Sequence, residues 1–266
     1  MLERWDVRTS DGGTIAVWIE GNGSPLVLVH GSTGSHKGFG PLMDELRDEF
    51  TVFAMDRRGF GASPDGPGYS AEREFGDVAA VVDAVASRTG EPVVLFGHSF
   101  GASCALGAAS QLSSLRALVL YEPSLGLQTT PPDFIDRLEE WLAAGDNEGA
   151  VIEMYTGIAG MTEDDIAIRR AAPDWPDKVA AAPTLAREFR IEQVWDWQRV
   201  SGSFADIGVP TLLITGSESP ADLAEVTSRT AAGIPSARVH VLAGHGHNAL
   251  RSSPAVVAEV LRNWLK

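Results

Sequence analysis

The 266-residue chain lacks several features that would place it in a special class of protein. It has one cysteine, Cys104, so no disulfide can form within the chain and a disulfide-stapled fold is excluded. No stretch approaches the roughly 18 apolar residues that a membrane-spanning helix needs. Residues 1–20 alternate polar and apolar side chains and lack the apolar core of a signal peptide. We therefore expect a globular, cytoplasmic protein.

Positive charge is also scarce, with 21 Lys and Arg against 36 Asp and Glu and a formal net charge of −15. The excess of negative charge would repel a phosphate backbone or an anionic membrane, so neither nucleic acid nor membrane is expected as a partner. It weakly favours a neutral or cationic small molecule. No spacing of His and Cys is typical of a metal site, and no cofactor is expected. The composition leaves the oligomeric state open.

Short apolar runs alternate with helical patterns in most of the chain. A hairpin pattern over residues 4–19 comes first, with turn-type glycines between its strands. The later runs are continuously apolar, as in strands that are covered on both faces. They lie at residues 25–30, 51–55, 93–97, 115–121, 210–216 and 237–242. This rhythm predicts an α/β fold with a mostly parallel, eight-stranded sheet between two layers of helices.

The rhythm stops between residues 124 and 204, where helical patterns follow one another without a strand. We expect this segment to be a helical cap inserted into a core domain made of residues 1–123 and 205–266. The stretch 126–204 has 15 acidic against 7 basic residues. Its tryptophans could pack the cap onto the core or line an apolar pocket, and both interpretations stay open. These are Trp141, Trp175, Trp195 and Trp197.

The most informative stretch is the strand pattern at 93–97 that runs into Gly97-His98-Ser99-Phe100-Gly101. This is the G-x-S-x-G pattern of a nucleophile elbow, followed here by the small-residue helix pattern 102–109. Glycine at both flanking positions removes side chains that would collide with the sharply turning backbone. The turn would expose the Ser99 hydroxyl and leave the Phe100 N–H at a helix start, where it can stabilise an oxyanion.

Further motifs accompany the elbow. They are His30-Gly31, the loop Asp56-Arg57-Arg58-Gly59-Phe60-Gly61-Ala62-Ser63, and Gly244-His245-Gly246-His247 followed by Pro254. With these motifs the chain resembles the α/β-hydrolase superfamily over nearly its whole length. The resemblance implies that Ser99 is the nucleophile and His247 the general base, although His245 competes for that position. It also implies an oxyanion hole formed by the backbone N–H groups of Ser32 and Phe100.

The acidic member of the triad departs from the usual pattern, because Ser219 stands where most members of the superfamily carry the acid. Two carboxylates could replace it. Glu122 follows the strand after the elbow helix, and parallel strands deliver their carboxyl ends to one rim, so it should emerge beside Ser99. Glu218 is the alternative acid, and a chain without a functional acid is the third possibility.

These residues favour a cofactor-independent serine hydrolase that forms an acyl-enzyme on Ser99. The expected substrate is a small ester, lactone or thioester, neutral and largely apolar. Two alternatives stay open. One is carbon–carbon bond hydrolysis, or another non-ester reaction, on the same scaffold. The other is a ligand-binding, receptor-like module with vestigial catalysis, which would tolerate the missing acid at residue 219.

Overall fold

A computed structural model describes residues 2–66, 68–124, 130–131, 133–158, 161–194 and 204–266. Its centre is an eight-stranded sheet with the order β1-β2-β4-β3-β5-β6-β7-β8. The strands are β1 (Glu3–Arg8), β2 (Thr14–Gly21), β3 (Ser24–Val29), β4 (Phe50–Met55), β5 (Val93–His98), β6 (Leu115–Tyr121), β7 (Thr211–Gly216) and β8 (Ala237–Leu242). Strand β2 is antiparallel to β1 and β4, and β3 to β8 are parallel. The predicted α/β fold with a mostly parallel sheet is confirmed.

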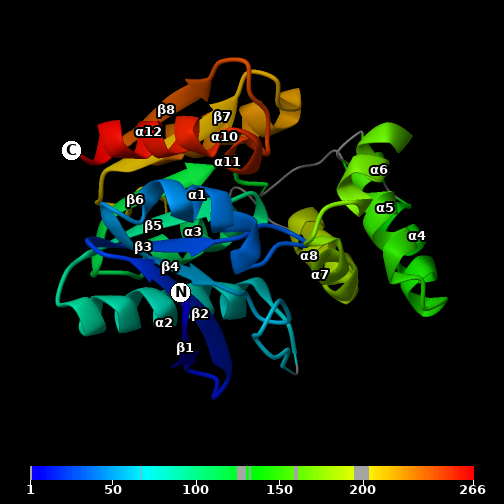
Figure 1. Cartoon of the computed structure of the whole chain (residues 1–266), viewed down its shortest axis with the longest axis horizontal. Helices are drawn as coiled ribbons and strands as arrows, with labels where there is room; N and C mark the ends of the chain where they lie inside the picture. Colours follow the sequence, from blue (N-terminus) through cyan, green and yellow to red (C-terminus); the bar gives the residue numbers. More distant parts are fainter. Residues whose placement is uncertain (1, 67, 125–129, 132, 159–160, 195–203) are drawn as a thin grey trace.

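The continuous apolar runs become the central strands because both faces of the sheet are covered. Along β3, Val27 and Val29 face one core cluster, whereas Leu26 and Leu28 face the other. Helices α2 and α3 cover the first face, and α1 and α12 cover the second (Figure 1). Outside the cap, the described helices are η1 (His36–Phe39), α1 (Gly40–Leu46), α2 (Ala71–Thr89), α3 (Phe100–Ala109), α10 (Ala221–Gly233), α11 (Ala249–Ser252) and α12 (Pro254–Leu265).

Between β6 and β7 the chain forms a group of helices that stands at one end of the sheet (Figure 1). They are α4 (Phe134–Ala143), α5 (Asn147–Gly157), α6 (Glu163–Arg170), α7 (Trp175–Ala180), η2 (Ala182–Thr184) and α8 (Leu185–Val194). These helices share an apolar cluster of their own that includes Phe134, Leu138 and Leu185. We call them the cap helices. The boundaries predicted for the cap and the core domain stay predictions.

A buried ion-pair network ties the cap helices to the core. Arg57, in the loop after β4, binds Glu74 of α2 at 2.8 Å and also pairs with Glu188 of α8. Its guanidinium lies over the rings of Phe60 and Phe100 at 4.7 and 4.6 Å. Because all three charged groups are buried, the position of α8 depends on this network. None of the described helices is long and apolar enough to cross a membrane.

Candidate active site

The elbow adopts the backbone geometry that its glycines allow. Ser99 connects β5 to α3 with φ 55° and ψ −129°, outside the backbone conformations that residues other than glycine prefer. A Cβ on Gly97 would lie 2.5 Å from the Ala102 Cα, and a Cβ on Gly101 would lie 2.3 Å from the His30 carbonyl oxygen. The Ser99 N–H donates to the Tyr121 carbonyl of β6 at 2.9 Å, which holds the turn against the sheet.

Backbone strain in the described part of the chain is concentrated at one rim. Besides glycines, the described residues with positive φ are Thr33, Ser99 and Glu122, at 53°, 55° and 46°. They follow β3, β5 and β6, three neighbouring strands whose carboxyl ends lie on the same side. Each such residue costs about 1–3 kcal/mol, and strain of this kind clusters at active sites. The rim is therefore a candidate active site on backbone grounds alone.

Glu122 emerges beside the elbow and turns its carboxylate toward His247. Its Oε2 lies 2.6 Å from the His247 Nδ1, and its Oε1 accepts hydrogen bonds from the Thr215 hydroxyl at 2.9 Å and the Gly216 N–H at 2.7 Å. The residue is fully buried. Burial opposes ionisation, but the hydrogen bond and charge of His247 outweigh it, so the pKa of Glu122 lies below its usual value. The carboxylate is thus charged at neutral pH and aligned with the imidazole.

The loop that carries His247 is held in place by its backbone. The Tyr121 hydroxyl donates to the Gly246 carbonyl, and the His98 Nε2–H donates to the His247 carbonyl at 2.8 Å. The rings of His98 and His247 are 4.5 Å apart. Burial, with the nearby charge of His247, lowers the pKa of His98 to about 3, so His98 is neutral and acts as a donor. A Cβ on Gly216 would lie 2.2 Å from the His245 carbonyl oxygen, so only glycine permits this approach.

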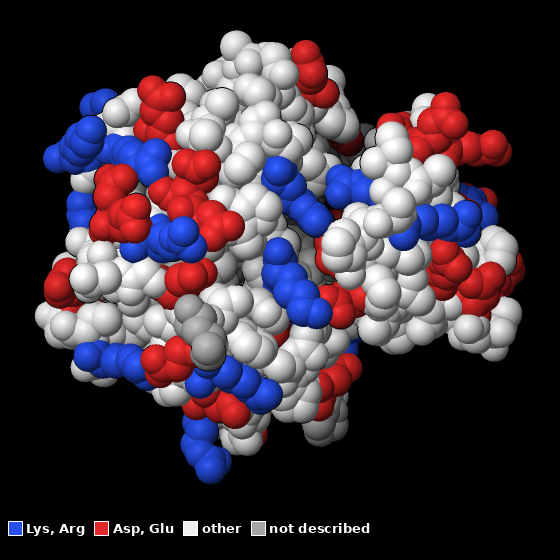
Figure 2. All heavy atoms as spheres, viewed as in Figure 1, with Lys and Arg blue, Asp and Glu red and all other residues white. Residues whose placement is uncertain are grey.

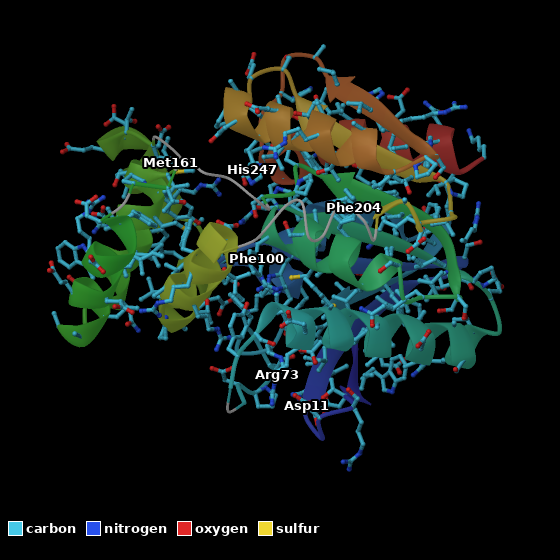
Figure 3. The ribbon with its side chains drawn as sticks, turned by 180° about the vertical axis from the view of Figure 1, so that it is seen from behind. Asp11, Arg73, Phe100, Met161, Phe204 and His247 are labelled. Carbon is cyan, nitrogen blue, oxygen red and sulfur yellow. The ribbon has the colours of Figure 1, made fainter. Side chains whose placement is uncertain are left out.

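Ser99 and His247 line one cavity of about 350 Å³. Figure 3 places Phe100 and His247 at the edge of the core that faces the cap helices. Among the described residues, no hydrogen bond joins the Ser99 hydroxyl to His247. Such bonds are often long in structures without substrate and tighten only when substrate binds. The cavity wall combines polar groups with apolar side chains of Met154, Phe189 and Leu250.

The predicted oxyanion residues lie on the loop after β3 and at the start of α3. Ser32 lines the cavity, and Phe100 begins α3, where the first N–H groups have no acceptor within the helix. His30 shapes the first loop. It accepts a hydrogen bond from the Arg57 N–H on Nε2 at 3.0 Å, so its Nδ1 carries the proton and donates to the Gly31 carbonyl at 2.8 Å. Burial lowers the pKa of His30 to about 4, which keeps the ring neutral.

The alternative acid and the alternative base take no part in the contact between Glu122 and His247. Glu218 is exposed, and its backbone N–H donates to the His245 carbonyl at 2.9 Å. Among the described hydrogen bonds, the one from Nδ1 to the Glu122 carboxylate is made by His247 rather than His245. Ser219, which the resemblance places at the usual position of the acid, has a buried hydroxyl.

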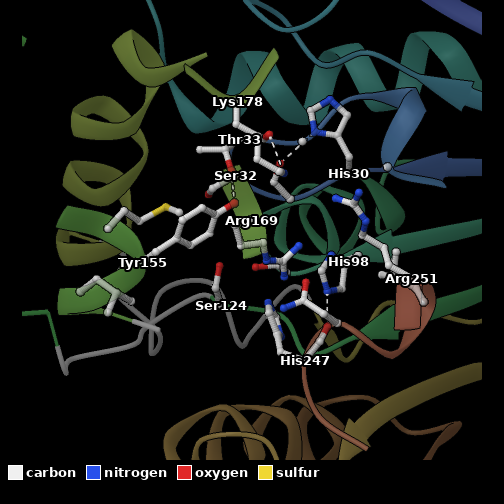
Figure 4. Close-up of a pocket in the computed structure, with 18 of the residues that line it drawn as sticks. His30, Ser32, Thr33, His98, Ser124, Tyr155, Arg169, Lys178, His247 and Arg251 are labelled. Carbon is white, nitrogen blue, oxygen red and sulfur yellow. Dashed lines mark hydrogen bonds between the residues drawn. The ribbon is translucent and has the colours of Figure 1, made fainter. Parts of the chain in front are cut away.

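Several cavity-lining residues escaped the sequence analysis. Glu192 of α8 is buried and receives a hydrogen bond from the Ser124 hydroxyl at 2.5 Å. The cationic side chains of Arg169, Lys178 and Arg251 also face the cavity (Figure 4). No motif marks these residues, because the way the cap packs on the core brings them to the site. Their spacing in the sequence is that of ordinary helix residues, so it did not indicate that they line a cavity.

The tryptophans of the predicted cap have no described place in this cavity. Trp175 is buried in the apolar cluster of the cap helices and stacks on Tyr155 with ring centroids 6.2 Å apart, so it packs within the cap helices and not between cap and core. Trp141 is 40% exposed. Trp195 and Trp197 lie outside the described residues. The described residues also contain no group of three or more His, Cys, Asp and Glu side chains that could hold a metal ion.

Comparison with known proteins identifies relatives over nearly the full chain. A sequence model described as the alpha/beta hydrolase family matches residues 26–260. The chain is 28% identical to 2-(acetamidomethylene)succinate hydrolase of Mesorhizobium japonicum, over 95% of this chain and 91% of that protein. It is 24% identical to esterase YbfF of Escherichia coli, over 92% and 94%. The crystal structure of an alpha/beta hydrolase from Sphaerobacter thermophilus has a TM-score of 0.86 and 34% identity, over 98% of this chain and 100% of that chain.

Proposed function

Because the chain belongs to the alpha/beta hydrolase family and is a hydrolase, we propose that it cleaves a small ester, lactone or thioester through an acyl-enzyme on Ser99. In this proposal His247 is the general base and Glu122 the acid of the triad. The backbone N–H groups of Ser32 and Phe100 form the oxyanion hole. The cytoplasm remains the location predicted from the sequence.

The proposed reaction has two halves. The Ser99 Oγ attacks the carbonyl carbon while His247 takes its proton, and the negative charge that forms on the carbonyl oxygen is stabilised by the two N–H groups. The intermediate collapses, and the leaving alcohol or thiol receives the proton from His247. Water then attacks the acyl-enzyme with His247 again as the base, which releases a carboxylic acid and restores Ser99. Glu122 stays ionised and stabilises the imidazolium in both halves.

The observation that carries this proposal is the 2.6 Å contact between the Glu122 Oε2 and the His247 Nδ1 at the strained rim that also bears Ser99. A carboxylate on Nδ1 keeps the proton on that nitrogen and leaves Nε2 able to accept the proton of a serine. A binding module has no need of this arrangement, nor of a strained Ser99. The relatives named as an esterase and a hydrolase support a hydrolytic reaction.

Labelling with a fluorophosphonate tests the proposal, combined with hydrolysis of 4-nitrophenyl esters of graded chain length. The wild type should label on Ser99 and turn over at least one ester, and Ser99→Ala should do neither. Ser113→Ala is the matched control, since this exposed serine lies before β6. A wild type that neither labels nor hydrolyses any ester would favour a binding module. Labelling without ester turnover would favour a carbon–carbon bond hydrolase.

A further inference from the structure

The cavity over Ser99 contains three cationic side chains that the proposed chemistry does not use. Arg169 comes from α6, Lys178 from α7 and Arg251 from α11. We propose that they form a subsite for a carboxylate on the acyl part of the substrate, with Arg169 as the residue that binds it. The preferred substrates would then be esters, or related acyl compounds, of short dicarboxylic acids. This inference rests on the proposed function.

Arg169 is the cation whose charge is least compensated. Its guanidinium lies 5.9 Å from the centre of the Tyr155 ring, and among the described residues it forms no ion pair. Asp165, one turn earlier, accepts hydrogen bonds on Oδ2 from the Thr162 N–H at 2.9 Å and hydroxyl at 2.7 Å, and the charge of Arg169 is the weakest of the causes that lower its pKa. A guanidinium at a cavity wall can bind a carboxylate through two parallel hydrogen bonds.

Lys178 and Arg251 share a single carboxylate, that of Asp174. The Asp174 Oδ2 lies 2.6 Å from the Arg251 guanidinium and 3.4 Å from the Lys178 ammonium. The lysine is only 7% exposed, and its other partner is the Thr33 carbonyl at 3.4 Å. Burial opposes ionisation of Asp174, but the two cations outweigh it and lower its pKa to about 2. The cluster therefore has one negative charge against two positive ones, which favours a second anion.

The three cations outnumber the carboxylates that face them. Asp177 is paired with Lys37 at 2.6 Å. Counting Asp174 and Asp222 against Arg169, Lys178 and Arg251 still leaves the cations in excess. Glu192 is buried, which raises its pKa to about 8, so at neutral pH it is mostly protonated and uncharged. Figure 2 shows Lys and Arg side chains along the border between the core and the cap.

The subsite lies close to the candidate catalytic residues. Lys178 lines the same cavity as Ser99 and as His98, the residue before Ser99. The same lysine contacts Thr33, the residue after the predicted oxyanion residue Ser32. A cavity of about 350 Å³ admits only a small molecule. A short acyl chain would therefore connect an ester carbon at Ser99 with a carboxylate at Arg169.

This substrate class differs from the neutral, largely apolar substrate expected from the sequence, where the net charge weakly favoured a neutral or cationic ligand. The total of −15 counts the whole chain, including exposed acids whose field is screened within about 10 Å at ordinary salt concentrations. A bound substrate is affected by the few charges that face it in a shielded cavity. In this cavity Arg169 is a cation that forms no ion pair with any of the described residues.

The test compares monomethyl succinate with methyl butyrate, which has a methyl group in place of the carboxylate. Released methanol gives kcat/KM for each ester. The wild type should prefer monomethyl succinate at least about tenfold, and Arg169→Gln should lower that preference about 10- to 100-fold. Arg169→Lys should retain part of it. Arg170→Gln is the matched control, because the neighbouring Arg170 binds Glu148 at 2.8 Å and does not line the cavity.

A wild type that prefers methyl butyrate, or an Arg169→Gln variant that loses both activities equally while still folded, would overturn the inference. In either case ester hydrolysis would still support the proposed function. If neither ester is cleaved and Ser99 does not label, the proposed function fails. The subsite can then be measured by the rise in thermal midpoint caused by succinate. A rise equal in wild type and Arg169→Gln would show that no carboxylate subsite exists at Arg169.

Discussion

Replacing Glu122 by glutamine separates the role of its charge from the role of its shape. The carboxylate of Glu122 faces His247 and also accepts hydrogen bonds from Thr215 and Gly216 of β7. The glutamine carbonyl can keep both of these. Its NH₂ group must then face the His247 Nδ1 in place of the Oε2 that now lies 2.6 Å away. An amide can only donate there, so the imidazole proton moves to Nε2, and the ring can no longer take a proton from Ser99.

The expected loss in rate follows from these two changes. A hydrogen bond to a charged group contributes about 1.5–3 kcal/mol, and the wrong tautomer adds to that loss. In a well-studied serine protease the equivalent change lowers kcat about 10⁴-fold. We therefore expect Glu122→Gln to lower kcat/KM for 4-nitrophenyl butyrate by about 10³- to 10⁴-fold, or about 4–5.5 kcal/mol of barrier.

The fold should survive this substitution. The pKa of Glu122 is lower in the folded chain than in the unfolded chain, so the carboxylate stabilises the fold above the unfolded value of about 4.3. That contribution disappears as the pH falls through the lower, folded value. Glu122→Gln should thus be less stable at neutral pH by about 1–3 kcal/mol, and the difference should shrink in acid.

The control for this experiment is Glu218→Gln, at the exposed position of the alternative acid. Its kcat/KM should stay within about twofold of the wild type, since surface substitutions away from a site have small effects. The reasoning is wrong if folded Glu122→Gln keeps more than a tenth of the wild-type rate. It is also wrong if Glu218→Gln is the inactive variant.

Three further substitutions test the energetics of the fold and the site. Ser99→Gly should unfold at a higher temperature than Ser99→Ala, by about 1 kcal/mol in stability, because glycine tolerates φ 55°. Equal midpoints would argue against stored strain. Burial raises the pKa of Glu192 to about 8, so the folded state holds a proton that the unfolded state releases, and wild-type stability should fall as pH rises from about 4.5 to 8. In urea titrations Glu192→Gln should remove about 2–4 kcal/mol of that fall, whereas an unchanged slope would contradict the assignment. Arg57→Ala leaves two buried carboxylates without their partner and should lower the free energy of unfolding by about 3–5 kcal/mol. Arg4→Ala, in an exposed pair, should lower it by less than about 0.5 kcal/mol. A similar loss in both variants would refute the stabilising role of the network.

Local patterns were enough to predict the sheet and the elbow. Strands β3 and β5 are buried on both faces, so their continuous apolar runs could be recognised in the sequence without knowing which strands they pair with. The elbow could be recognised because its pattern is contiguous in the sequence, and one of its glycines, Gly97, is required by a local contact with Ala102. The position of Glu122 at the rim also followed from strand order, since parallel neighbours end on the same side.

Contacts between the cap and the core left no such pattern. Arg57 belongs to a recognisable loop motif, but only the packed α8 supplies Glu188 as its partner, 131 residues away. In the sequence, Arg169 and Lys178 look like ordinary surface charges of helices, because the direction of a side chain into a cavity depends on how the cap helices pack on the core. Periodicity places a residue on a face of its own helix. It does not say what that face will meet.

The amino-acid sequence alone thus determined the class of sheet, the strained turn at Ser99 and the strand end that bears Glu122, because each depends on neighbours in the chain or in the adjacent strand. Only the tertiary structure decided which carboxylate meets His247 and which charges face the cavity. Those outcomes depend on angstrom-scale distances between loops more than a hundred residues apart, such as the 125 residues between Glu122 and His247. Net charge is a property of the chain, whereas the potential in a cavity is a property of the fold.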